Sequence, residues 1–229
     1  MTNKKTLGLA IALATIALPA AAQTSPWYTG LNLGQSKTGS ELVSNREGTI
    51  SNATNFASYF DDKDTAWRFF VGWRLNPYIS IEANYADYGK TRTDTQFNVP
   101  GGPTNFGRIV VDREVKGFGG DLVLTLPIWE QFSIFGRAGY FRAETEAAGQ
   151  ISGDVFFTDG LGGTTRDNTH KENLGKYGVG AEWMFSPNVG ARLEWERLPN
   201  VGKKFAAGES NTTGEADIDT WSIGVVWRF

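Results

Sequence analysis

The chain has 229 residues, of which 40% are hydrophobic, and its 22 basic and 25 acidic side chains give a net charge of −3. This balance argues against a nucleic-acid partner, because phosphate binding requires a basic surface. The sequence contains no cysteine, which excludes a fold held together by disulfides, and its length suits one domain.

Residues 1–22 have the pattern of a secretory signal peptide. Two lysines precede an apolar run that ends near Leu18, and three alanines that end at Ala22 offer a small-residue cleavage site. The run is too short to cross a bilayer core of about 30 Å as a helix, so a retained anchor helix is the less favoured alternative. We therefore expect residues 23–229 to form the exported domain.

Eight later segments alternate apolar residues with small or polar ones at a period of two, which is typical of strands. In chain order they cover residues 27–34, 67–74, 79–86, 117–126, 132–140, 176–185, 189–196 and 221–229. No segment after residue 22 approaches the length of a membrane helix, and an even strand count suits a closed barrel. We predict an all-β fold: an eight-stranded antiparallel up-and-down transmembrane β-barrel, whose last strand closes against the first.

Short and long connections alternate along the chain. The short ones are Pro-marked turns at 76–78, 127–131 and 186–188. The long ones are polar and Gly-rich, at about 38–64, 90–113, 146–172 and 198–216. Membrane barrels separate short periplasmic turns from long extracellular loops in this way, so we expect the same sidedness here.

The residues that alternate with the apolar ones form the second parity of each strand, and they carry the charges. The ionisable residues of this parity are Arg68, Arg74, Glu82, Asp121, Arg137, Lys176, Glu182, Arg192, Glu194, Glu196 and Arg228. The signs nearly balance, which fits a filled, salt-bridged lumen better than an open pore, because buried charges must be paired. A soluble barrel with the apolar parity inside would expose the same charges to water, so charge alone leaves that alternative open.

The aromatic residues favour the membrane barrel. In an up-and-down path, Trp27 and Trp73 fall at the turn end of the strands, whereas Trp67, Trp195 and Trp221 fall at the long-loop end. Two aromatic belts with aliphatic residues between them are the interfacial girdles of a membrane barrel. A soluble core would place its largest rings in the middle.

Several stretches together resemble the transmembrane domain of the OmpA family: "PWYTGLNLGQS" (26–36), "RLNPYISIEANYADYG" (74–89), "LPIWEQFSIFGRAGYFRAET" (126–145), "YGVGAEWMFSPNVGARLEWE" (177–196) and "SIGVVWRF" (222–229). Small barrels of this type have lumens just wide enough for side chains. The resemblance implies a structural protein of the outer membrane of a Gram-negative bacterium, in contact with lipid and lipopolysaccharide. It also implies at most low porin activity for small solutes.

The resemblance assigns further roles. Trp227 and Phe229 resemble the terminal signal by which barrel-assembly machinery recognises its clients. Full-length relatives continue into a peptidoglycan-binding domain, which we do not expect in this chain.

Inside the family's barrel, a Glu, a Lys, a second Glu and an Arg form a switchable gate. By local motif, Glu82, Glu182 and Arg192 match three of these positions, whereas Val123 stands at the position of the Lys. Arg137 and Glu194 are further inward charges. The simpler interpretation is that all of these residues form structural salt bridges. Because Val123 replaces the Lys, we expect Glu82 to lack a second cation nearby and the closed state to dominate.

We expect neither catalysis nor a cofactor or metal. The single histidine, His170, lies in a polar stretch beside Lys171 without the partners of a catalytic base. An alternative function is surface interaction, in which the long loops contact host surfaces, phage or lipopolysaccharide. The candidate contact residues are Phe97, Phe106, Phe156, Phe157 and Phe205.

Overall fold

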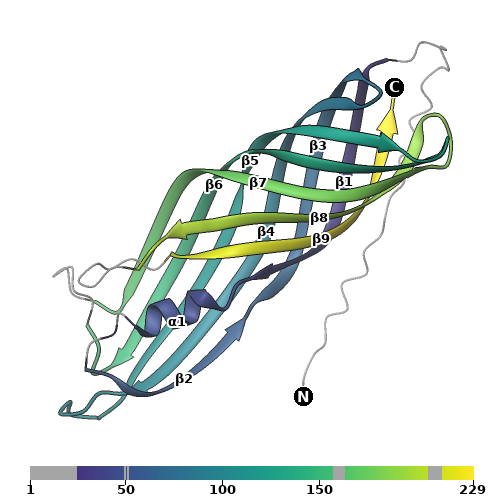
Figure 1. The fold of residues 1–229 in the computed structure, drawn as a ribbon. Coiled ribbons are helices and arrows are strands. Elements are labelled where there is room, and N and C mark those ends of the chain that lie inside the picture. Colours follow the sequence, from purple (N-terminus) through teal and green to yellow (C-terminus); the bar gives the residue numbers. More distant parts are fainter. Residues whose placement is uncertain (1–24, 49, 51, 157–162, 206–212) are drawn as a thin grey trace, which may run out of the picture.

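An antiparallel sheet that closes on itself dominates the structure, a computed structural model that describes residues 25–48, 50, 52–156, 163–205 and 213–229 (Figure 1). The expected signal peptide and Phe157 lie outside the described residues. The elements in chain order are β1 Trp27–Thr38, α1 Glu41–Glu47, β2 Thr54–Asp61, β3 Lys63–Asn76, β4 Ile79–Asn98, β5 Gly107–Pro127, β6 Phe132–Gly153, β7 Thr165–Met184, β8 Val189–Lys203 and β9 Gly214–Arg228. Within these ranges, no helix is long and apolar enough to cross a membrane.

Eight strands form the ring. β1 pairs with β3 on one side and with β9 on the other, and every strand from β3 to β8 pairs with the next one along the chain. The remaining strand, β2, is separated from β3 by Asp62 and pairs with the far end of β4. β2 therefore pairs with β4 beyond the point where the pairing of β3 with β4 ends. The eight-stranded up-and-down barrel, closed by its first and last strands, is confirmed.

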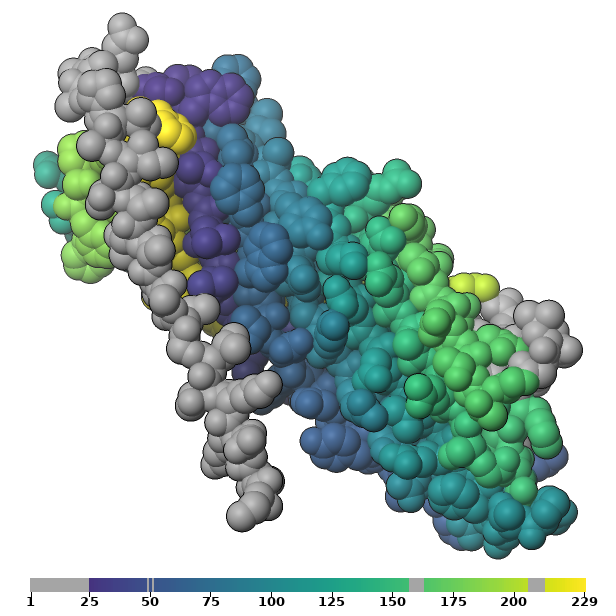
Figure 2. Space-filling model, turned by 180° about the vertical axis from the view of Figure 1, so that it is seen from behind, coloured from purple at the N-terminus to yellow at the C-terminus, as the bar shows by residue number. Residues whose placement is uncertain are grey.

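The apolar parity faces outward. Leu124 and Ile223 are 55% and 64% exposed, whereas Arg137 and Glu82, on the other parity, are buried. Viewed from behind, the outward side chains of β1, β3 and β4 form oblique, closely packed rows (Figure 2). A soluble barrel with its apolar parity inside is therefore excluded.

The strands run well beyond the expected loop boundaries. Much of 90–113, 146–172 and 198–216 belongs to β4–β9, and His170 lies in β7 and not in a loop. These strands were missed because their outer faces carry charges in place of apolar residues. Cross-strand ion pairs line this face: Asp94–Arg108 at 2.5 Å, Lys116–Glu146 at 2.9 Å and Glu144–Lys171 at 3.0 Å. Opposite charges across a sheet stabilise pairing much as apolar contacts do.

The ring is complete only toward the short turns. β7 and β8 pair from Met184–Gly190 up to Tyr177–Arg197 and then part, while β7 continues beside β6 to Thr165 (Figure 1). The outer half of the barrel is the part that lies beyond the Tyr177–Arg197 pair, away from the short turns. The turn-end half is the part between that pair and the short turns.

Two contacts hold β8 in place across the gap in the outer half, one from Arg113 of β5 and one from Glu172 of β7. The Arg113 guanidinium donates to the Val201 carbonyl at 2.8 Å, and the Gly202 N–H donates to the Glu172 carboxylate. Burial lowers the pKa of Arg113 to about 10, and nearby Glu172 opposes the shift. In this region side chains replace the missing backbone ladder.

α1 packs beside the outer end of β9. The Gly39 N–H donates to the Asp217 carbonyl at 2.9 Å, and the Asp217 N–H donates to the Glu41 carboxylate at 3.3 Å. Leu42 of α1 is buried. The helix thus lies against β9 in the outer half, just after the end of β1 at Thr38.

Candidate functional site

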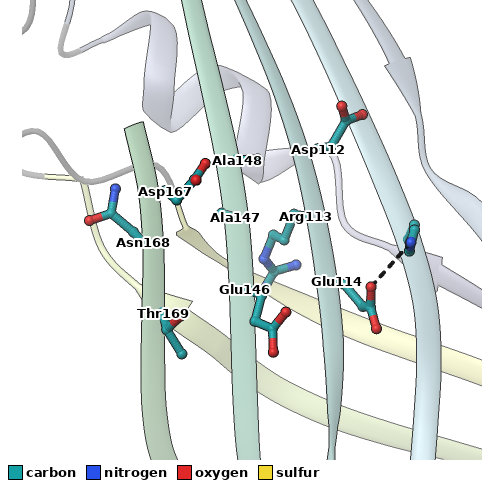
Figure 3. A pocket seen from close by; sticks show the side chains of 10 residues that line it. Asp112, Arg113, Glu114, Glu146, Ala147, Ala148, Asp167, Asn168 and Thr169 are labelled. Atoms are coloured by element: carbon teal, nitrogen blue, oxygen red, sulfur yellow. Dashed lines mark ion pairs between the residues drawn. The ribbon is translucent and has the colours of Figure 1, made fainter. Parts of the chain in front are cut away.

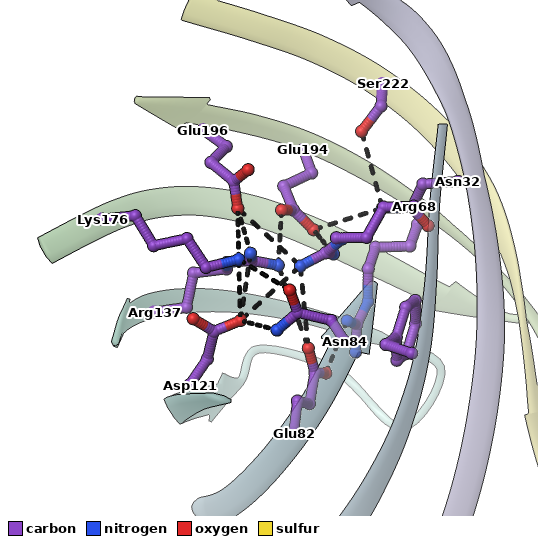
Figure 4. Close-up of polar contacts among 12 residues, drawn as sticks. Asn32, Arg68, Glu82, Asn84, Asp121, Arg137, Lys176, Glu194, Glu196 and Ser222 are labelled. Carbon is purple, nitrogen blue, oxygen red and sulfur yellow. Dashed lines mark hydrogen bonds and ion pairs between the residues drawn. The ribbon is translucent and has the colours of Figure 1, made fainter. Parts of the chain in front are cut away.

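The inward charges meet in one connected network that fills the turn-end half of the barrel and ends at Lys176, just past its border (Figure 4). They project from β3 to β9, where alternate residues face the lumen. Three groups of contacts follow one another from the short turns toward the outer half.

Arg192 is the centre of the group at the turn end. Its Nη1 lies 2.7 Å from Glu82 and its Nη2 lies 2.9 Å from Glu182. Arg228 adds a second cation to Glu182 at 2.5 Å, and the Tyr28 hydroxyl donates to Glu82 at 3.0 Å. Both carboxylates of the expected gate are therefore held by one guanidinium.

Two aromatic rings hold the Arg192 guanidinium in place. Its central carbon lies 4.6 Å from the ring centre of Phe70 and 4.6 Å from that of Phe135. Cation–π contacts of this kind strengthen where water is excluded. The rings fill the lumen around the cation and limit its movement.

Arg137 is the centre of the middle group. It contacts Glu194 at 2.8 Å and Asp121 at 3.1 Å, and it donates to Glu196. Arg68 reaches Glu194 from the opposite wall at 2.6 Å. The two expected charges Arg137 and Glu194 are therefore direct partners.

Lys176 forms the third group. Its ammonium lies 3.3 Å from Asp121 and 3.2 Å from Glu196, and it donates to the Asn84 side-chain oxygen at 3.0 Å. The Tyr88 hydroxyl donates to Glu196 at 2.5 Å. Beyond this group the lumen becomes apolar, with a buried cluster of Ala86, Tyr88, Val115, Phe141, Ala143, Leu198, Val201 and Ile218.

The ion-paired cations and carboxylates of the network are equal in number, and a sixth inward cation, Arg74, lies over the Tyr28 ring at the vestibule. Five cations (Arg68, Arg137, Lys176, Arg192 and Arg228) face five carboxylates (Glu82, Asp121, Glu182, Glu194 and Glu196). Removal of one partner from such a set leaves an uncompensated buried charge, which costs about 3–5 kcal/mol. The network therefore resists changes that break single pairs.

One expectation about Glu82 is wrong. Val123 does point inward and is buried, but Glu82 has further cations besides Arg192. Arg68 and Arg137 each lie 3.9 Å from it. Both reach it across the narrow lumen, which motif matching along single strands does not reveal.

The free space found among the described lumen charges is small. A cavity of about 20 Å³ beside Arg68 and Glu194 has room for about one water molecule. At the turn end, a vestibule of about 190 Å³ reaches inward to Glu182 and Arg192. The vestibule thus leads directly to the expected gate residues.

Four polar residues of the network were absent from the sequence-based site: Tyr28, Asn32, Asn84 and Tyr88. Asn32 donates to Glu194 at 3.3 Å, and Asn84 donates to Asp121 at 2.7 Å. The inward parity of Tyr28, Asn32 and Asn84 was visible in the alternation, so the sequence did contain a signal for these three, whereas Tyr88 lies beyond the segment 79–86. Attention to ionisable groups alone missed that signal.

The expected aromatic belts lie on the outer face. Trp27 stacks on Trp73 toward the short turns, with ring centres 6.2 Å apart. Toward the outer half, Trp67 lies 5.5 Å from Tyr85, and Trp195 lies 6.0 Å from Tyr177. The remaining expected aromatic residues, Trp221, Trp227 and Phe229, are also at least partly exposed.

The outer half carries a separate hollow of about 360 Å³ (Figure 3). Its lining is Lys90, Asp112, Arg113, Glu114, Glu146, Ala147, Ala148, Asp167, Asn168 and Thr169. The ion pairs of this face engage its charges; for example, Lys90 lies 3.3 Å from Glu114. In the part of the chain that the structure describes, no cluster of His, Asp and Glu is arranged to hold a metal ion.

The candidate contact aromatics are not all at the surface. Phe156 is 84% exposed and Phe106 is exposed, but Phe97 is buried inside the barrel against Phe56. The ring of Phe205 lies 5.0 Å from the Arg46 guanidinium. Phe97 was expected to be a surface contact, and this is wrong. It belongs to β4, and its side chain points to the inner face of that strand.

Comparisons with known proteins agree with the architecture. The sequence profile of the outer membrane protein beta-barrel domain matches residues 8–229. The chain is 27% identical, over 99% of its length, to outer membrane protein A of Escherichia fergusonii, and 24% identical, over 99%, to outer membrane protein P5 of Haemophilus influenzae. It covers 56% and 61% of these two relatives, so it spans little more than half their length. Among solved structures, Neisserial surface protein A matches 90% of the chain, and 98% of its own, with a TM-score of 0.50 and 14% identity.

Proposed function

Because the chain belongs to the outer membrane protein beta-barrel family, whose members reside in the outer membrane, we propose that it is a structural barrel that passes small solutes only rarely. The ion-pair network carries this proposal. Five cations and five carboxylates cross the lumen between the turn-end vestibule and the apolar cluster, and the space left among them is small. An ion on that path would have to separate oppositely charged side chains that are almost fully buried.

A switchable gate of the family's kind is a finer form of the same proposal. Arg192 holds Glu82 in the present arrangement, while Arg68 and Arg137 stand close enough to take it over. We propose that these arginines serve in place of the lysine that Val123 replaces. The closed arrangement remains dominant because Arg192 also holds Glu182 and is stacked between two rings.

Single-channel conductance in planar bilayers tests the proposal. The wild-type chain should open seldom, whereas Arg192→Ala should open more often and unfold more easily, because it leaves Glu82 and Glu182 short of a cation. Lys171→Ala is the matched control, since it removes a cation from the exposed face of the outer half. Frequent large openings in the wild type, or an Arg192→Ala variant that conducts and unfolds like the control, would contradict the model.

A second candidate function rests on the exposed aromatics of the outer half. Tyr59 and Phe156 are 67% and 84% exposed, and Phe106 lies between β4 and β5. Their separation from the lumen supports a role in surface interaction with host molecules, phage or lipopolysaccharide. Replacing all three by Ser should reduce binding of cells or phage while leaving conductance unchanged. Equal binding by both forms would remove this candidate.

Two further roles stay predictions. Recognition by barrel-assembly machinery through Trp227 and Phe229 follows from the resemblance described above, as does the absence of catalysis. Outer-membrane levels of a Phe229→Ser variant would test the first. An assay for lipid or peptide hydrolysis with the purified chain would test the second.

A further inference from the structure

The outer face of the barrel contains an apolar hollow of about 550 Å³ across β5 to β9. Its outward-facing lining is Leu124, Leu126, Ile134, Gly136, Val179, Ala181, Leu193, Trp195 and Trp221. These residues fall in two neighbouring rows of the sheet register. One row runs Leu124–Gly136–Val179–Trp195–Trp221, and the other runs Leu126–Ile134–Ala181–Leu193.

The floor of the hollow is made of small residues between larger ones. A Cβ atom built on Gly136 would meet no atom within 4 Å, so the space above this residue is open. Leu124 and Val179 stand on either side of Gly136 in its row, and Ala181 continues the floor in the next row. The hollow is therefore a trough with aliphatic walls and is free of outward-facing charges.

The trough climbs obliquely from the turn end toward the outer half. Leu124 lies three residues from the turn-end limit of its strand at Pro127, whereas Trp221 lies seven residues from Arg228. Four strand spacings separate the two residues, roughly 19 Å at the usual spacing of about 4.8 Å. The upper end thus lies at Trp195 and Trp221, whose indole rings are of the kind that sits at the level of lipid headgroups.

We propose that this trough binds one acyl chain of an outer-leaflet lipid, with the headgroup end at Trp195 and Trp221. The trough lies on the membrane-facing wall, where water is absent and an unfilled apolar hollow loses its dispersion contacts. Its length is close to one leaflet of a bilayer core of about 30 Å. A second barrel would present a convex wall, which matches a narrow concave trough poorly, whereas a single hydrocarbon chain fits it.

Recognition depends on the chain and not on the headgroup charge. The cation nearest to the upper end along β8 is Arg197, two residues beyond Trp195 on the same face. Its guanidinium is already held by Asp217 at 2.5 Å and by Asp219 at 3.6 Å. It therefore offers no free positive charge to a phosphate. The inference rests on the location of the barrel in the membrane and is independent of the state of the lumen.

Native mass spectrometry of the full chain in detergent, with added dimyristoylphosphatidylglycerol, tests the proposal. The wild type should retain one lipid per barrel, whereas Gly136→Leu and Ala181→Leu, which fill the floor, should each reduce that occupancy about tenfold. Gly120→Leu is the matched control: this outward glycine lies outside the trough, and an added Cβ would contact only the Glu82 carbonyl at 3.8 Å. It should retain lipid like the wild type. Neutral dimyristoylphosphatidylcholine should give the same pattern.

Heat-modifiable gel mobility shows that each variant is folded before lipid is counted. No retained lipid in the wild type, or equal occupancy in the wild type and both floor variants, would overturn the proposal. A wild-type dimer that Gly136→Leu abolishes would also overturn it, by assigning the trough to a second copy. Retention of the acidic lipid alone would show that a headgroup site is responsible and that the trough is not.

Discussion

The turn-end half and the outer half of this barrel are built from the same strands but differ in strand pairing and in the outward side chains. In the turn-end half every strand pairs with both neighbours, and the outward side chains are apolar. In the outer half β7 and β8 part, and outward charges pair across the strands instead. Unpaired backbone is not tolerated in hydrocarbon, whereas water can satisfy it. The position at which the ring opens therefore follows the change of solvent.

Ion pairs also behave differently in the two halves. Those of the lumen are buried, shared among several partners and balanced overall. Those of the outer face are at least partly exposed to water, and such pairs contribute about 0–1 kcal/mol. Ion pairs are thus expected to contribute much to the stability of the lumen and little to that of the outer face. The predictions below probe this difference.

The largest effect is expected from Arg137→Ala. This side chain is fully buried and is shared by Glu194, Asp121 and Glu196. Its loss should cost about 3–5 kcal/mol of unfolding free energy, because buried carboxylates lose their cation. Unfolding in urea, followed by gel mobility, measures this cost. Lys171→Ala, from the exposed pair with Glu144, should cost no more than about 1 kcal/mol; equal losses would contradict the distinction between the halves.

The next largest difference between the two halves is expected when a cation is placed on the outward face of each. Leu124→Arg puts a charge into hydrocarbon and should cost about 2–4 kcal/mol, which reduces insertion. Ala148→Arg, on the exposed outer face of β6 and opposite Asp112 and Asp167, should not destabilise the barrel. Refolding yield into lipid vesicles is the measurement. Thr125→Arg, one residue along β5 with the opposite parity, should be milder than Leu124→Arg, and the reverse order would contradict the assigned faces.

Hydrogen exchange should show where the ring opens. Amides of 177–184 are enclosed by pairing with both β6 and β8, whereas those of 165–176 pair with β6 alone. We expect peptides from the second range to exchange at least tenfold faster in bilayer nanodiscs. Uniform protection along β7 would mean that the two strands remain joined in the outer half.

The smallest expected effect is a pH dependence of the outer half. Hydrogen bonds from Arg108 hold the pKa of Asp94 below its ordinary range. Because the folded-state pKa is depressed, the pair stabilises this region above the ordinary value of about 3.9, and the contribution is lost as the pH falls through the folded pKa. Exchange at 92–98 should therefore rise by a few-fold in acid relative to an Asp94→Asn variant. Identical acid responses in both proteins would count against this role for the pair.

Much of this architecture was predictable because a membrane barrel has a two-residue period. The alternation identified eight strands, both faces and the inward position of Lys176. It failed for the outer half, where both faces are polar or mixed, so β2 and the far ends of β4 to β9 were taken for loops. Phe97 was misplaced for the same reason.

The partners of the lumen charges were only partly predictable. Glu182 and Arg192 stand opposite each other on neighbouring strands, so register alone suggested their contact. The approach of Arg68 to Glu194 is different, because β3 and β8 are not neighbours in the ring. Such pairs depend on the diameter and stagger of the closed barrel, which no single strand encodes.

The pairing of β1 with β9 has a consequence for the order of assembly. It joins Leu31 to Val225 and so closes the longest loop in the chain, at an entropic cost that only the finished sheet can offset. Until that seam forms, a growing sheet presents two unsatisfied edges, each able to pair with a foreign strand. The seam is therefore the natural final step of folding, and a chain halted before it would be the species most exposed to aggregation.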